Sequence, residues 1–358
     1  MSAARAADRV LTDEQLATMA RRPRDRVGRH LLAGEVAEAA EVTARLEAEL
    51  HGQIDRYTHW TSGLFAFLTE RHGAEGSAAA LHATRGFFAV YPAVGAVHAE
   101  LPPPMAGLVA SAGEADPYGT LVDLDTVLAH WRNLVDLHRD WISALLSEVY
   151  RRHGPDELEA AHRHVGERTM ANLMAGFDAP VEERLERFVW LLLGHFSELT
   201  ITEEPSRFVI SQHPCGTCGR QAAQGRDHEP LGLAVVADDH LITWGGRTTT
   251  IYRTHVPVWH VAMAVERIGV PWPVNLCPAG TTEPDCRILF YKDPLDPAAL
   301  ADVPGSLTLA SLGPTPAPAG PAGSAHTAGP AVGAESRPAP ASSFGASSRV
   351  AEPARRQP

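Results

Sequence analysis

The sequence predicts an α+β fold with a helical N-terminal half, a C-terminal antiparallel sheet with a packed helix, and a disordered C-terminal tail. Residues 1–195 carry apolar side chains at helical spacing. Residues 196–300 contain short alternating segments that are separated by turn residues. Residues 313–358 are rich in Pro, Ala, Gly and Ser and lack the large apolar side chains of a packed core. We therefore expect two folded domains and one tail.

The composition narrows the class of protein. The chain has 358 residues, of which 44% are hydrophobic, and a formal net charge of −12. Acidic proteins are poor general binders of nucleic acid. The sequence lacks an apolar run of about 20 residues that could span a membrane, and residues 1–10 lack the apolar centre of a secretory signal. We expect a cytoplasmic protein with neither nucleic acid nor membrane as a partner, and oligomerisation stays open.

The first helices have clear sequence signals. Thr12 and Gln15 form a capping box, which predicts a helix through Met19. Residues 34–52 are rich in Ala, Glu and Leu, which favour helix. A last helix is expected over residues 181–196.

Two segments of the helical half resemble each other. Residues 60–73 and 141–154 share Trp, Ser, Leu and a closing Arg-His-Gly at one constant offset. This predicts an internal duplication of a helical hairpin, over about residues 56–82 and 137–163.

The ends of these two copies have a structural interpretation. Gly73 and Gly154 are expected just after the helix C-termini, where glycine accepts a positive φ. We interpret His72 and His153 as compensating the helix dipole rather than as catalytic. The polar run of residues 138–140, beside Trp141, is expected at the surface.

The C-terminal half predicts short strands and one helix. Residues 198–202 and 207–211 alternate about a turn and predict a hairpin. Residues 257–268 predict a helix with proline in its first turn and Gly269 as its stop. Further strands are expected at residues 241–244, 272–277 and 286–291.

The motif His213-Pro-Cys-Gly-Thr-Cys-Gly-Arg220 is the clearest chemical signal. Cys215 and Cys218 are each followed by glycine, which is typical of a metal-binding turn for zinc or another divalent transition metal. A redox Cys-x-x-Cys is expected at a helix N-terminus inside a βαβ unit. The residues after Cys218 do not predict a helix, so the context favours metal.

A tetrahedral ion needs more ligands than this motif supplies. Cys277 and Cys286 lie at the facing ends of the last predicted hairpin and would complete a four-cysteine site. Alternatively, the further ligands would be histidines: His255 from a loop and His260 from the first turn of the following helix. Both cysteines can also be read as packed strand thiols, and His260 as an ordinary helix-face residue. His213 and His240 are further candidates.

Residues 198–294 resemble a largely uncharacterised bacterial family related to L-2-amino-thiazoline-4-carboxylate hydrolases and vinyl-reductase-type small-molecule-binding domains. The motifs that carry the resemblance are His213-Pro-Cys-Gly, Arg220, His240-Leu-Ile-Thr-Trp-Gly, Tyr252-x-x-His255, Glu266-Arg-Ile-Gly and the run from Asp285 to Asp293. Relatives have glycine at the position of Cys218, and cysteines at the positions of Arg253 and Val256. The resemblance implies hydrolysis or ring opening of a small amino-acid-like heterocycle in specialised metabolism.

Two functions follow as expectations. One is a metal-dependent hydrolase or lyase with a metal on Cys215, Cys218 and His255, an open fourth position, and a pocket between the helices and the sheet. Its candidate general bases are His260, His213 and Glu266. The other is a non-catalytic small-molecule-binding or structural zinc protein, in which four cysteines close the site. A thiol redox protein is a third interpretation.

Overall fold

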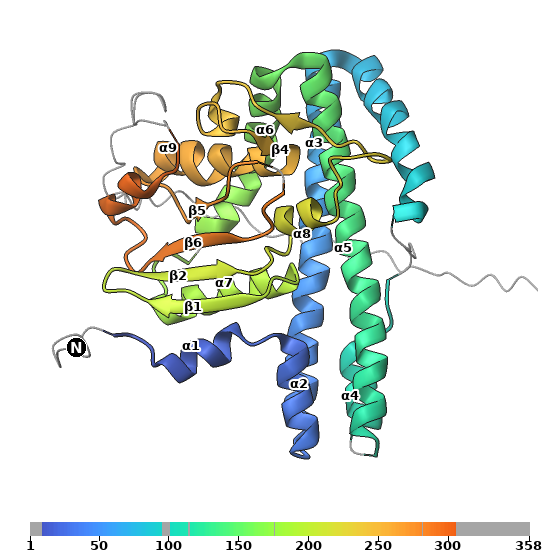
Figure 1. Ribbon diagram of the computed structural model, residues 1–358, viewed down its shortest axis with the longest axis vertical. Coiled ribbons are helices and arrows are strands. Elements are labelled where there is room, and N and C mark those ends of the chain that lie inside the picture. The colour runs from blue at the N-terminus through green and yellow to red at the C-terminus, as the bar shows by residue number, and fades with distance from the viewer. Residues whose placement is uncertain (1–8, 95–100, 114, 175, 281, 306–358) are drawn as a thin grey trace, which may run out of the picture. The chain divides into compact units, whose positions relative to one another are not determined.

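A computed structural model describes residues 9–94, 101–113, 115–174, 176–280 and 282–305 (Figure 1). It confirms the α+β class, with a mostly helical N-terminal part followed by a four-stranded antiparallel sheet. The tail expected at residues 313–358 lies outside the described residues. Among the described residues, no helix is both long and apolar enough to cross a bilayer.

Seven helices in the described residues precede the sheet. They are α1 (Asp13–Ala20), α2 (Pro23–Leu32), α3 (Val36–Val94), α4 (Met105–Ala112), α5 (Pro117–His153), α6 (Pro155–Met174) and α7 (Val181–Gly194). The capping box is present, because the Thr12 hydroxyl accepts from the Gln15 amide and the Gln15 side chain accepts from the Thr12 amide. The long helices α3 and α5 pack side by side, and other helices pack against both of them (Figure 1).

The two copies of the predicted repeat end alike. Gly73, inside α3, has φ 72°, and Gly154, after α5, has φ 84°. The histidines that precede these glycines stack with 3.9 Å between ring centroids. Trp60 packs among histidine and aromatic rings, however, whereas Trp141 packs against the rings of Phe65 and Phe88. The duplication therefore stays a prediction.

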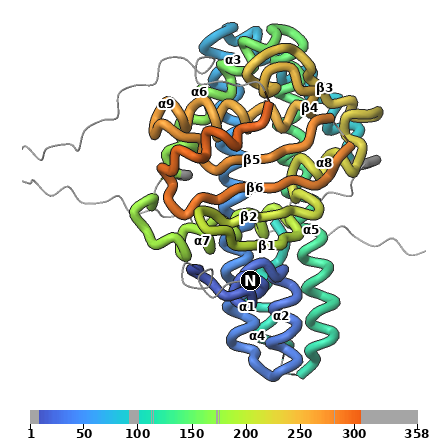
Figure 2. Tube along the Cα trace, turned by 60° about the vertical axis from the view of Figure 1, so that its left-hand side comes forward, coloured from blue at the N-terminus to red at the C-terminus, as the bar shows by residue number. Residues whose placement is uncertain are grey.

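The sheet contains β1 (Leu199–Glu203), β2 (Arg207–Gln212), β5 (Val274–Leu276) and β6 (Cys286–Tyr291). Its order is β1-β2-β6-β5, and every neighbouring pair is antiparallel (Figure 2). Both predicted hairpins are confirmed. Helix α7 packs against the sheet, with the rings of Phe188 and Phe290 5.4 Å apart. One apolar core extends from the helices to the sheet.

The segments between β2 and β5 complete the fold. They are α8 (Cys218–Ala223), the paired strands β3 (Val235–Val236) and β4 (Thr249–Thr250), the 3₁₀ turns Leu241–Thr243 and Ile251–Thr254, the π-helix η4 (Pro257–Met263) and α9 (Ala264–Ile268). A last 3₁₀ turn, Pro297–Asp302, follows β6.

Two sequence expectations fail in this region. Residues 241–244 do not form a strand, because the His240 side chain caps a 3₁₀ turn that Trp244 ends at φ 55°. A helix does follow Cys218, since α8 begins there. The predicted helix over residues 257–268 is present and stops at Gly269, which has φ 81°.

Candidate functional site

The four cysteines meet in the interior. The Sγ atoms of Cys215 and Cys218 are 3.7 Å apart. Cys215 also contacts Cys286, and Cys277 contacts both Cys218 and Cys286, so the four sulfurs form a ring. All four thiols are free and buried.

The sheet and two glycines bring the four thiols together. In the β2–β6 register Gln212 is paired with Cys286, and its side-chain amide donates to that sulfur at 2.8 Å. A Cβ atom on Gly216 would lie 2.1 Å from the His195 carbonyl oxygen, and one on Gly219 would lie 1.8 Å from that of Pro284. Glycine is therefore required here for close backbone approach.

A buried cation faces the sulfurs. Arg253 has no exposed surface, and its guanidinium donates to the backbone carbonyls of Pro278, Gly280 and Glu283. No carboxylate in the described residues pairs with it. It contacts Cys218, and the attraction of Cys218 and Cys277 opposes the burial penalty and raises the pKa of Arg253. Since a buried cation requires compensation, this environment favours thiolates.

The thiols also influence one another. Hydrogen bonds from Cys218 and Cys286 lower the pKa of Cys215 well below its ordinary value. The same two partners lower the pKa of Cys277. Two of the four sulfurs are therefore favoured as thiolates, the form that binds metal.

The donor set suits a soft divalent metal. Zinc–sulfur bonds of about 2.3 Å in a tetrahedron place sulfurs about 3.8 Å apart, close to the 3.7 Å between Cys215 and Cys218. In the described parts of the chain, however, no group of three or more His, Cys, Asp or Glu side chains stands ready to hold a metal ion.

An aromatic pocket adjoins the cysteines. The sulfurs line a small cavity of about 120 Å³. A larger cavity of about 330 Å³ lies beside it. The residues that line both are Leu191, His195, Tyr252, His255 and His260. The cysteine cluster thus lies next to a space large enough for a small molecule.

The walls of this pocket are aromatic. Trp60 lies 4.5 Å from Trp259 and 5.5 Å from Tyr252 between ring centroids. The hydroxyls of Tyr57 and Tyr252 lie 3.2 Å apart. Arg56 and Arg168 also line the pocket. Sequence reasoning missed Tyr57, Trp60 and His195, because they come from the helical half and nothing local marks them as functional.

A π-helix places two histidines together. His255 was expected in a loop, but its φ of −70° and ψ of −26° continue the helical path into η4. In an α-helix, residues five apart would diverge by about 140°. The wider π-helical turn brings residues i and i+5 to one side, so the rings of His255 and His260 are 6.2 Å apart and both line the pocket.

Burial keeps these histidines neutral. It lowers the pKa of His195 and of His255 to about 3, and lowers that of His260. Nδ1 of His260 lies 3.1 Å from the Trp272 carbonyl oxygen. That contact assigns the ring proton to Nδ1 and leaves Nε2 free to accept a proton.

Three other predicted residues do not join the site. Glu266 pairs with Arg163 at 2.9 Å. His213 is largely exposed and pairs with Asp285 at 2.7 Å, and His240 lies 3.0 Å from Asp156. Neither Glu266, His213 nor His240 lines either cavity.

The polar run beside Trp141 holds the cysteine motif in place. Arg139 and Asp140 were expected at the surface but are completely buried. Arg139 pairs with Asp140 at 2.7 Å and with Asp136 at 2.9 Å. From α8, Arg220 pairs with Asp136 and the Gln221 amide donates to Asp140. Burial is possible because every charge has a partner, and the network fastens α8 to α5.

No protein-family model, curated protein or solved structure matches the chain. The family resemblance of residues 198–294 stays a prediction, and function is inferred from the site alone.

Proposed function

We propose that this chain is a metalloprotein that holds one zinc-class divalent ion on its four cysteines and binds a small planar molecule in the adjoining aromatic pocket. The observation that carries the proposal is the shared lining of the two cavities, where His195, His255 and His260 separate the sulfurs from the aromatic walls.

The charges around the sulfurs support a metal. Cys215, Cys218, Cys277 and Cys286 supply four soft donors, and Arg253 faces them without a carboxylate partner among the described residues. Four thiolates around a divalent ion carry a net charge of about −2, which the guanidinium offsets in part. The Gln212 amide on Cys286 would orient that ligand from outside.

The pocket supports a flat ligand. Trp60, Trp259 and Tyr252 offer ring faces and edges that pack well against an aromatic or heterocyclic molecule. The cavity of about 330 Å³ is within the range of small-molecule sites.

Catalysis is a second candidate function, favoured by the histidines. Four sulfurs would complete the coordination of a tetrahedral ion, so the metal would not bind substrate. It would instead stabilise the side of the pocket that adjoins the cysteines. Proton transfer would then fall to His260, whose Nε2 can accept a proton from water. This arrangement suits hydrolysis or ring opening of a small heterocycle, with the metal in a structural role.

Metal analysis of the purified full chain tests the metal site. We expect about one zinc per chain, and loss of the metal in Cys218→Ser and in Cys286→Ser. His213→Gln, beside the cluster but outside the cavity, is the control and should retain the ion. If Cys277→Ser and Cys286→Ser both retain the metal and His255→Gln loses it, the ligands are cysteines and histidine rather than four cysteines. A metal-free protein that oxidises to a Cys215–Cys218 disulfide would favour redox chemistry.

Calorimetry with benzimidazole tests the pocket. Trp60→Leu is expected to weaken binding by about tenfold, since it removes one stacking face. Trp141→Leu is the matched control, because Trp141 is the counterpart of Trp60 in the predicted repeat and lies outside the pocket. Equal effects of the two substitutions would contradict the proposed ligand site.

A further inference from the structure

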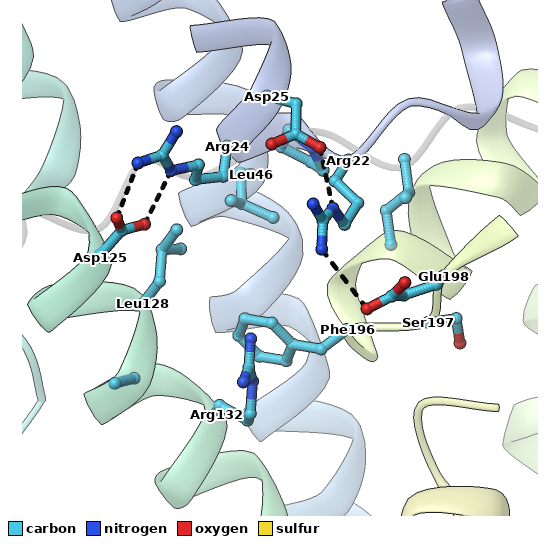
Figure 3. Close-up of a pocket in the computed structure, with 13 residues that line it drawn as sticks. Arg22, Arg24, Asp25, Leu46, Asp125, Leu128, Arg132, Phe196, Ser197 and Glu198 are labelled. Atoms are coloured by element: carbon cyan, nitrogen blue, oxygen red, sulfur yellow. Dashed lines mark hydrogen bonds and ion pairs between the residues drawn. The ribbon is translucent and has the colours of Figure 1, made fainter. Parts of the chain in front are cut away.

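A separate cavity, of about 470 Å³, lies between the start of α2, the helices α3 and α5, and the connection from α7 to β1 (Figure 3). It shares no lining residue with the aromatic pocket. Part of its wall is apolar and comes from Leu46, Leu128, Leu193 and Phe196.

The carboxylates of this cavity are already paired. Arg24 donates to both oxygens of Asp125 at 2.8 and 2.7 Å. Arg22 donates to Asp25 at 2.8 Å and to Glu198 at 3.4 Å (Figure 3). These two arginines engage all three acidic side chains that line the space.

Arg132 is the cation that remains. Within the described residues no carboxylate lies at ion-pair distance from it, although Asp136 and, less strongly, Glu198 attract it from farther away. The side chain of Arg132 stays exposed to solvent, and partial desolvation, followed by repulsion from Arg220, lowers the pKa of Arg132. Its guanidinium lies 5.1 Å from the ring centroid of Phe196. The guanidinium of Arg132 therefore offers hydrogen-bond donors to an anion in the cavity that it lines.

Phe196 is held in an unusual conformation. Its φ is 61°, a value that bulky residues rarely adopt and that costs energy. The conformation directs the ring to the cavity, next to Arg132 (Figure 3). The guanidinium of Arg220 lies 5.9 Å from the same ring. The ring and the unpaired cation therefore form one surface.

We propose that this cavity is a binding site for a small organic monocarboxylate. The carboxylate would take two hydrogen bonds from the planar guanidinium of Arg132, and the apolar body of the ligand would pack on Phe196 and Leu128. The three paired acids repel further negative charge, so a monoanion fits the cavity better than a polyanion.

Calorimetric titration of the full chain with benzoate tests the site. Arg132→Gln is expected to weaken benzoate binding by tenfold or more, because it removes a charge-assisted bidentate contact. Arg168→Gln is the matched control, since it removes an arginine from the aromatic pocket instead. Phe196→Leu should weaken benzoate binding, because it removes the ring on which the ligand packs. Circular dichroism melting curves establish that each variant is folded.

Several results would overturn the proposal. One is the absence of heat with millimolar benzoate. Another is an equal affinity in Arg132→Gln and the parent chain. Loss of binding in Arg168→Gln alone would place benzoate in the aromatic pocket. Full competition by inorganic phosphate at the same concentration would reduce the site to an unselective anion contact.

Discussion

Arg139 and Asp136 form an ion pair of 2.9 Å inside the protein, one helical turn apart on α5. Asp136 also pairs with Arg220 from α8, the helix that Cys218 begins. These two arginines lower the pKa of Asp136 against the opposing effect of burial. One carboxylate thus joins the long helix to the cysteine motif.

Asp136→Ala is expected to destabilise the fold by about 3–5 kcal/mol, because it leaves Arg139 and Arg220 without this partner in a buried setting. Urea unfolding measures the change in free energy. Asp125→Ala on the same helix is the control, because its pair with Arg24 is exposed and should be worth about 0–1 kcal/mol. Similar losses of unfolding free energy in both variants would show that the buried ion pair contributes no more to stability than the exposed one.

Gln212→Leu is expected to weaken metal binding by about 10–100-fold without removing a ligand, because the amide that donates to Cys286 orients the sulfur. Competition with a colorimetric chelator measures the affinity. Ser211→Ala, one residue earlier on β2, is the control. An unchanged affinity in Gln212→Leu would mean that Cys286 is not a ligand, or that its orientation does not need the amide.

Gly166→Ala is expected to cost about 1–3 kcal/mol and to disturb the pocket, because a Cβ atom would lie 2.5 Å from Nε1 of Trp259. That indole nitrogen donates to the His162 carbonyl at 2.7 Å. Gly86→Ala is the control, since nothing lies near its Cβ position in α3, and it should stabilise by about 0.5–1 kcal/mol. Thermal unfolding distinguishes the two, and opposite signs are the expected result.

The free energy of unfolding is expected to fall as the pH falls below 6.5. Burial holds the pKa of His162 well below 6.5, so the unfolded chain takes up a proton that folded His162 does not. The contribution of neutral His162 to the free energy of unfolding is therefore fully present above pH 6.5. It is lost on acidification, by at most about 1.4 kcal/mol per pH unit. In His162→Gln the stability measured between pH 6.5 and 5 should fall less steeply, and parallel curves for the two proteins would contradict this.

Local patterns were sufficient for much of the fold. The Thr12 capping box, the two hairpins and the glycine stop at Gly269 depend on neighbouring residues, and each is present. Local patterns failed where contacts between distant residues determine the local structure. Helix α8 is short and is held by Arg220 and Gln221 on buried acids of α5, so its own six residues carry little helical signal.

By itself, the sequence determined the α+β class and predicted a metal site at Cys215 and Cys218, because hydrophobic periodicity and the Cys-x-x-Cys spacing are local properties. Only the tertiary structure decided that Cys277 and Cys286 reach the same point, and that Tyr57 and Trp60 supply a wall of the pocket. Contacts between residues far apart in sequence depend on how α3 and α5 pack beside the sheet, and no local pattern records that packing.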